Sequence, residues 1–341
     1  MFLQKSTSIP VDPNKGTKMP FLSMQRICVA LLAFATVTAS AQTYPNRAIR
    51  IVVPYPPGGG ADITARPIAQ MLAERWGQPV VVDNHGGASG MIGAEIVAKA
   101  PPDGYTIMVS ASAEVALNVA LFPKMTYDPV KDFAPITLAT VTPIALVVNP
   151  SVPITSVKEY IAFAAAKPGS LTFGSAGTAS PHHFAGEWLK MLAKIDIVHV
   201  PYKGMAPAIT DMLGGHLPSG FVTLLPALQY VKAGKLRALA VTTPTRALLL
   251  PGVPTLAETL PGFDISQWNA VWAPAGTPKD VLDKLSKEIR RIVQSPDYKA
   301  RMLEQGSEAV GNSPSELAAF QRAEIDKYRK IAQQANIKAD H

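Results

Sequence analysis

Cysteine is almost absent from this chain. Its 341 residues include a single cysteine, Cys28, which lies in an apolar stretch near the N-terminus. If processing removes that stretch, the remaining chain has no thiol. A chain without thiols forms no disulfide, no thiolate metal site and no cysteine nucleophile, so these three classes of function are excluded together.

Catalytic and nucleotide-binding motifs are missing as well. The chain has no Gly-x-Ser-x-Gly sequence, so it lacks a hydrolase-type nucleophile elbow. The glycines at 58–60 are followed by Ala61, Asp62 and Ile63, which does not match the dinucleotide fingerprint, and no Gly-Lys-Ser/Thr sequence marks a phosphate-binding loop. The net charge of +7 comes without a basic run, so no nucleic-acid partner is expected.

The N-terminus has the three parts of a secretory signal peptide. Arg26 supplies a positive charge, residues 27–37 are mostly apolar, and Ala39-Ser-Ala41 is a small-residue cleavage site. The apolar part is too short to span a bilayer comfortably. We therefore expect residues 1–41 to be an extension and signal peptide cleaved after Ala41, and the protein to reach the periplasm. The alternative is a buried N-terminal helix.

Cleavage would leave 300 of the 341 residues, enough for two domains of ordinary size. It would remove four basic residues and one acidic residue, so the net charge would fall from +7 to +4. This mild charge supports only weak, general attraction for anions.

Short apolar runs alternate with amphipathic stretches along the rest of the chain. This alternation predicts an α/β fold, with mixed, mostly parallel sheets flanked by helices. Near the C-terminus, Thr277 and the capping box from Ser313 to Glu316 predict two helix starts. The predicted strands are residues 51–53, 80–82, 105–109, 144–148, 171–173, 197–200 and 236–241, and the predicted helices between them include 157–166, 184–193 and 206–213.

A proline- and glycine-rich loop follows the first predicted strand. Residues 54–60 read Pro-Tyr-Pro-Pro-Gly-Gly-Gly, and a helical pattern opens at Asp62. The start of a helix presents unpaired N–H groups and a partial positive charge, which favours an anion. Glycine also lets the backbone approach a bound molecule closely.

Three more loops of this kind follow predicted strands: residues 86–90, 110–112 and 173–183. The last carries the hydroxyl groups of Ser175, Thr178 and Ser180. Ligands of open α/β sheets bind at the carboxyl ends of the strands, where all four loops are predicted to lie. Each loop alone is also consistent with a simple tight turn. Together they favour an anion-binding cleft.

Histidines offer the main alternative chemistry. His183 and Glu187 are four residues apart, a spacing that places two metal ligands on one helix face. No third ligand is evident, so we predict neither a metal nor another cofactor. His183 is expected to line the cleft, and His199 to face a partly polar layer from a strand.

These segments, taken in order, resemble the Bug-type periplasmic receptors, which are the substrate-binding proteins of tripartite tricarboxylate transporters. The resemblance covers residues 44–337. The segments that carry it are residues 51–60, 77–82, 100–105, 127–133, 173–177, 199–204, 232–241, 253–255 and 273–278.

The resemblance implies a two-lobed periplasmic-binding-protein fold of type II. One lobe would comprise residues 42–144 and 266–341, and the other residues 145–265. A small carboxylated ligand would lie between them and pass unchanged to a membrane permease, with the receptor acting as a monomer. The ligand-binding residues implied by the motifs are Tyr55, Pro57, Gly58, Gly59, Ser89, Gly90, Ser110, Ser112, Ser175, Ala176, Gly177, Thr178, Ser180, His183 and Tyr202.

The chain departs from the family pattern in three places. Residues 84–90 lack the family's arginine, and Ala179-Ser180 replaces a Gly-Ser pair. Two acidic positions of the family are occupied by Pro218 and Val222. We therefore expect a ligand without an amino group. An exported enzyme or a ligand sensor built on the same lobes, with His183, Tyr202 or Ser175 in the chemistry, is the alternative function.

Overall fold

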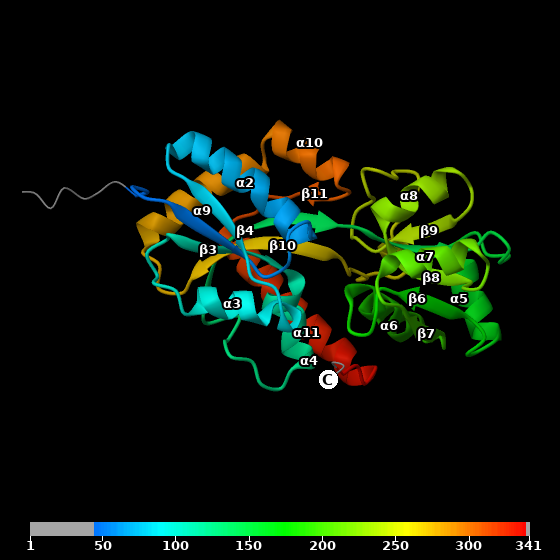
Figure 1. Ribbon diagram of the computed structural model, residues 1–341. Helices are drawn as coiled ribbons and strands as arrows, with labels where there is room; N and C mark the ends of the chain where they lie inside the picture. The colour runs from blue at the N-terminus through cyan, green and yellow to red at the C-terminus, as the bar shows by residue number, and fades with distance from the viewer. Residues whose placement is uncertain (1–43, 339–341) are drawn as a thin grey trace, which may run out of the picture. The chain divides into compact units, whose positions relative to one another are not determined.

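The computed structural model describes residues 44–338 (Figure 1). The predicted signal peptide and Cys28 lie outside these residues. The first sheet, sheet A, has six strands in the order β11-β4-β10-β3-β1-β2. Strands β1, β2 and β3 pair in parallel, whereas β10 runs antiparallel to β3 and β4, and β11 antiparallel to β4. The bounds are β1 Ile49–Val53, β2 Val80–Asn84, β3 Thr106–Ala111, β4 Phe133–Thr142, β10 Gln267–Pro274 and β11 Glu308–Ala309.

The second sheet, sheet B, has five strands in the order β7-β6-β8-β5-β9. The chain enters it from β4, runs through all five strands, and returns to sheet A at β10. Within sheet B, β6 is parallel to β7 and β8, and β5 is antiparallel to β8 and β9. The bounds are β5 Ile144–Val148, β6 Thr172–Ser175, β7 Val198–Pro201, β8 Ser219–Thr223 and β9 Arg237–Val241.

Helices cover both faces of each sheet (Figure 1). On sheet A, α2 (Gly60–Trp76) and α9 (Lys279–Val293) lie on one face, and α3 (Met91–Ala98) and α11 (Pro314–Gln334) on the other. On sheet B, α7 and α8 lie opposite α5 and α6. The α/β class and the two mixed sheets are thus confirmed. The expectation of mostly parallel pairing is wrong, because five of the nine strand pairs are antiparallel. The other bounds are α4 Asn118–Leu121, α5 Val157–Ala166, α6 Pro181–Ala193, α7 Met205–Leu213, α8 Leu224–Lys232, α10 Pro296–Glu304, η1 Ala88–Gly90, η2 Ala113–Leu117 and η3 Leu256–Glu258.

The predicted helix starts differ in accuracy. The capping box at Ser313 is present, because its hydroxyl accepts from the N–H of Glu316 while the Glu316 carboxylate bonds back to Ser313. Helix α9 starts after Pro278, and Thr277 does not cap it. Helix α2 starts at Gly60, two residues before Asp62. None of the helices among residues 44–338 combines the length and apolar character needed to cross a membrane.

Candidate functional site

Two adjoining cavities lie at the carboxyl ends of the parallel strands. The first has a volume of about 420 Å³ and the second about 360 Å³. Tyr55, Ala113 and Pro181 line both, so we treat the two cavities as one cleft. The other residues of the first cavity are Gly59, Gly60, Ala61, Ala111, Ser112, Thr142, Thr223, Gln267, Trp268, Asn269, Gln305 and Ser307. Those of the second are Ser89, Leu117, Asn118, Leu121, Phe122, Thr178, Ala179 and Ser180.

The lining of the cleft is uncharged and mixes apolar with polar groups. Its side chains are hydroxyls, amides, aromatic rings and aliphatic groups, with no Lys, Arg, Asp, Glu or His among those that line the two cavities. An anion placed here would meet N–H and O–H dipoles in place of a cation. The electrostatic attraction must therefore come from hydrogen bonds and from helix termini.

Helix α2 points its first turn into the first cavity. Gly59 is its N-cap, and Gly60 and Ala61 occupy the first turn, where N–H groups have no acceptor within the helix. Asp62, in the same turn, is buried and turned away from the cavity. Its carboxylate accepts hydrogen bonds from the N–H of Gly58 at 2.9 Å and from the Arg66 guanidinium at 2.8 and 2.9 Å.

These donors stabilise the ionised form of Asp62. Burial opposes ionisation, but the hydrogen bonds from Arg66, Gly58 and Asn84 outweigh it and lower the pKa of Asp62. The N–H of Gly58 is therefore already taken by a carboxylate of the protein itself. The donors that remain toward the cavity are those at the very start of α2.

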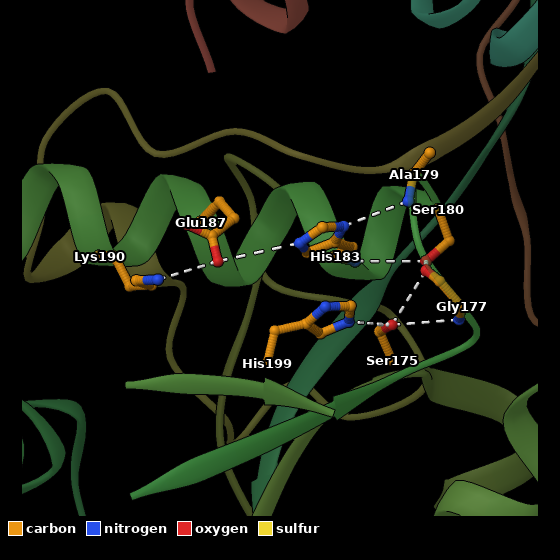
Figure 2. A network of polar contacts seen from close by, with 8 residues as sticks. All are labelled: Ser175, Gly177, Ala179, Ser180, His183, Glu187, Lys190 and His199. Carbon is orange, nitrogen blue, oxygen red and sulfur yellow. Dashed lines mark hydrogen bonds and ion pairs between the residues drawn. The ribbon is translucent and has the colours of Figure 1, made fainter. Parts of the chain in front are cut away.

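The loop between β6 and α6 is locked by Ser175 (Figure 2). The buried Ser175 hydroxyl donates to the carbonyl of Gly177 at 3.0 Å and accepts from the Gly177 N–H at 3.1 Å. Its oxygen also lies 2.7 Å from Nε2 of His199. Ser180 caps α6, because its hydroxyl accepts from the N–H of His183. Most donors of this loop are therefore used within the loop.

Two histidine rings stack behind this loop. The His183 and His199 rings are parallel, with centroids 3.7 Å apart (Figure 2). Burial lowers the pKa of His183 to about 3 and that of His199 to about 4, and the nearby Lys190 charge adds to both shifts. Burial also lowers the pKa of His182 to about 4. All three rings are neutral at pH 7, so they support the loop and do not supply positive charge.

The pair with metal-ligand spacing, His183 and Glu187, has other partners. Nδ1 of His183 accepts from the N–H of Ala179 at 3.2 Å, which leaves the ring proton on Nε2, 3.9 Å from the Glu187 carboxylate. Lys190 donates to the same carboxylate oxygen at 3.1 Å. Across residues 44–338, no group of three or more His, Cys, Asp or Glu side chains is arranged to hold a metal ion.

The residues implied by the family motifs fall into two layers. Tyr55, Gly59, Ser89, Ser112, Thr178 and Ser180 line the cleft. A second group lies in the adjoining loops or behind the lining. Ser110 is buried and accepts from Nε1 of Trp272 at 2.9 Å, and Tyr202 donates to Asp211 at 2.7 Å. The other members of the second group are Pro57, Gly58, Gly90, Ser175, Ala176, Gly177 and His183.

Several lining residues have no local sequence signal. Gln305 and Ser307 lie in the connection between α10 and β11, and the Ser307 hydroxyl is 2.7 Å from that of Thr142, 165 residues away in sequence. Thr223, at the end of β8, lies 3.0 Å from His182 and donates to Gln267 at 3.1 Å. Long-range strand pairing brings these residues together, and no spacing along the chain reveals it.

The two positions where the family's acids are absent lie outside the cleft lining. Val222 is fully buried in the apolar cluster beneath α7 and α8. Pro218 directly precedes β8, where its carbonyl accepts from the N–H of Asn149. Strand β8 pairs regularly with β5 over its five residues, so the proline just before it does not disturb the register.

Comparison with known proteins shows to which family this chain belongs. The family model described as the tripartite tricarboxylate transporter family receptor matches residues 64–337. Protein BugT of Bordetella pertussis is 35% identical over 324 residues, which is 93% of this chain and 99% of that protein.

Solved structures agree. A Rhodopseudomonas palustris protein with adipate is 36% identical, with a TM-score of 0.71, over 87% of this chain and 100% of that one. MatC from the same organism, with bound malate, is 31% identical, with a TM-score of 0.66, over 84% and 99%. The predicted family is confirmed: the chain belongs to the tripartite tricarboxylate transporter receptors, a family of periplasmic solute-binding proteins.

Proposed function

We propose that this protein captures a small carboxylate without an amino group in the cleft and delivers it, unchanged, to the membrane permease of a tripartite transporter. The observation that carries the proposal is the first turn of α2, which lines an uncharged cavity in a member of this receptor family. Relatives solved with adipate and malate support a carboxylate as the ligand class.

The available donors suffice energetically. A hydrogen bond to a charged group contributes about 1.5–3 kcal/mol, and a helix terminus adds about 0.3–1 kcal/mol. Micromolar affinity requires about 8 kcal/mol net of ordering costs. Four donors, the first N–H groups of α2 and the hydroxyls of Ser112 and Thr178, reach that range when water is excluded.

The lining also argues against an ammonium group on the ligand. A buried ammonium needs an anionic or strongly accepting partner, and none of the residues that line the two cavities is acidic. An amino acid would therefore lose the hydration of its ammonium without a compensating ion pair.

We infer two lobes around this cleft, residues 42–144 with 266–341 and residues 145–265. The passage of the chain from sheet A to sheet B and back at β10 supports this division. We also propose cleavage after Ala41, residence in the periplasm, and action as a monomer that hands its ligand to permease subunits.

Binding without chemistry is part of the proposal. Ser175 and His199 have the short contact of a nucleophile and base, at 2.7 Å, and this is the observation that favours an enzyme. However, Ser175 is fully buried and both donates to and accepts from Gly177. Its hydroxyl is committed to the loop, so we expect it not to attack a substrate.

Matched ligand pairs test the proposal. Isothermal titration calorimetry should compare adipate with adipamide, and succinate with aspartate, because each pair changes one kind of group. We expect carboxylates to bind one to one and to be recovered unchanged, the diamide not to bind, and aspartate to bind more weakly than succinate. Preference for aspartate, or a ligand recovered altered, would overturn the proposal. Trp268 lines the first cavity, so its fluorescence gives a second readout.

A further inference from the structure

Glu114 is a buried acid that the proposed binding site leaves unexplained. It is fully buried on the π-helical turn η2, and neither of its carboxylate oxygens has a hydrogen-bond partner of good geometry. Buried polar groups are nearly always hydrogen-bonded, because an unpaired one loses its hydration without compensation. An isolated buried acid therefore calls for a function.

The carboxyl group supports one wall of the cleft. A Cβ atom added at Gly90 would lie 2.5 Å from Cγ and Oε1 of Glu114, so only glycine fits against it. Residues 87–90 all have positive φ, from 47° to 127°, which makes this a strained left-handed turn. Asn118 holds the turn from the other side by donating to the carbonyl of Ser89 at 2.9 Å, and both residues line the second cavity.

The carboxyl group is also coupled to Tyr55, which lines both cavities. Burial raises the pKa of Tyr55 well above its usual range, and the charge of Glu114 adds to that shift. The other titratable neighbour is Tyr127, whose hydroxyl donates to the Glu114 backbone carbonyl at 2.8 Å. Helix α11 contributes the neutral Gln321, which donates to the carbonyl of Val115.

The surroundings favour the protonated acid. Burial raises the pKa of Glu114 to about 8, although the backbone at residues 111 and 114 and the Tyr55 hydroxyl oppose part of the shift. Neither phenol carries positive charge, so neither Tyr55 nor Tyr127 compensates an ionised Glu114. With this pKa, most molecules carry the proton at pH 7, and this wall of the cleft is then neutral.

We propose that Glu114 is a positioning residue whose proton must be in place for the cleft to hold an anionic ligand, so that ligand capture and protonation are coupled. The inference rests on the proposed function. An ionised Glu114 would set a negative charge in a poorly hydrated wall beside Tyr55 and the 87–90 turn, where it would repel the bound carboxylate. Binding of the anion would in turn raise the proton affinity of Glu114.

The first test needs no ligand. Because the folded protein keeps this proton up to about pH 8 and an unfolded glutamate loses it near pH 4.3, Glu114 costs stability progressively as the pH rises from about 4.3 to 8. Thermal unfolding of the purified protein is measured from pH 5 to 9 for the wild type, Glu114→Gln and Glu304→Gln, the last being the same change at an exposed site. Glu114→Gln alone should raise Tm near pH 8 and flatten the pH dependence. Equal slopes in the wild type and Glu114→Gln would overturn the inference.

The second test measures adipate affinity by calorimetry between pH 6 and 9.5, a range in which adipate stays ionised. The wild-type Kd should be constant below about pH 7 and rise about tenfold or more by pH 9.5. Glu114→Gln should bind as tightly as the wild type at pH 6 and lose less than about twofold across the range, whereas Glu304→Gln should follow the wild type. A wild-type Kd that does not change with pH would overturn the coupling while leaving the proposed function intact. Absence of binding by adipate, malate and succinate at every pH would refute the proposed function, and the inference with it.

Discussion

The two loops that open the cleft look alike in sequence but use their donors differently. Each is glycine-bearing, follows a buried strand and precedes a helix. The β1–α2 loop leaves the start of α2 facing the first cavity, with Asp62 turned away to hold Gly58 and Arg66. In the β6–α6 loop, the hydroxyls of Ser175 and Ser180 form hydrogen bonds with the loop's own backbone and with the start of α6. A sequence motif therefore shows which loops form the walls of the site. Whether a loop can also bind a ligand depends on how many of its hydrogen-bond donors are not already used within the protein.

The largest effect should come from a negative charge placed in the first loop. A Cβ at Gly60 would have 3.9 Å to its nearest neighbour, Nδ2 of Asn269, so a side chain fits there. Gly60→Asp should keep the fold, because an acid suits the first turn of a helix. It should weaken carboxylate binding by about 4 kcal/mol, roughly a thousandfold, since like charges about 4 Å apart repel by that amount near a protein surface.

Gly60→Asn is the matched control for this change, because it adds nearly the same volume without charge. It should cost no more than about tenfold in Kd by calorimetry. Equal losses of carboxylate affinity in the two variants would mean that the added volume, and not the charge, prevents binding. The start of α2 would then not attract the ligand electrostatically.

Removal of the lock in the second loop should act mainly on stability. Ser175→Ala leaves the N–H of Gly177 and Nε2 of His199 without their partner, which costs about 1–3 kcal/mol for buried groups. Urea unfolding measures this loss. Ser170→Ala, in an exposed turn, is the control and should change stability by less than about 0.5 kcal/mol. A Ser175→Ala protein of unchanged stability that loses binding outright would indicate direct contact with the ligand.

The histidines behind the second loop predict a stability that falls in acid. The unfolded chain binds protons at histidine below about pH 6.5, whereas folded His182 and His199 do so only near pH 4 and His183 near pH 3. The contribution of these three histidines to stability should therefore be constant above pH 7 and decline from about pH 6.5 to 4, in addition to the opposite trend expected from Glu114. The slope is at most about 1.4 kcal/mol per pH unit for a fully buried ring, and smaller for the half-buried His199.

His199→Gln tests this decline, because glutamine cannot titrate yet can still bond to Ser175. Its urea midpoint should change less steeply than that of the wild type between pH 6.5 and 4. Identical slopes in the two proteins would show that His199 takes no part in the acid sensitivity.

The smallest effect should be at Ser112, which lines the first cavity beside the start of α2. Ser112→Ala removes one uncharged donor, so the carboxylate should lose about 1.5–3 kcal/mol if the hydroxyl contacts it directly. Because backbone groups nearby can take over part of that role, we expect the lower end, about tenfold in Kd by calorimetry. No change at all would place the carboxylate away from Ser112.

Sequence patterns predicted the local elements well and the long-range ones poorly. The strands at 144–148 and the helix at 157–166 match β5 and α5 residue for residue. Strands β4 and β10 were not predicted, because their apolar runs have no clean alternation. The capping box at Ser313 was readable because all of its atoms lie within four residues.

The same division applies to the site. Tyr55, Gly59 and Ser112 could be placed from motifs, because each follows the end of a predicted strand. Gln305 and Glu114 could not, since one enters the cleft from α10 and the other matters through its burial. Burial and unmet hydrogen bonds are properties of the folded chain, and no residue spacing encodes them.

In the function proposed for this protein, the backbone N–H groups at the start of α2 hold the carboxylate. Titration of the ¹⁵N-labelled protein with adipate, followed by NMR, tests it most directly, with adipamide as the neutral control. The amide protons of Gly60 and Ala61 should shift strongly downfield with adipate and remain in place with adipamide. If these two signals stay unchanged while adipate binds, and those of residues 176–180 shift instead, the carboxylate is held by the β6–α6 loop and not by the start of α2.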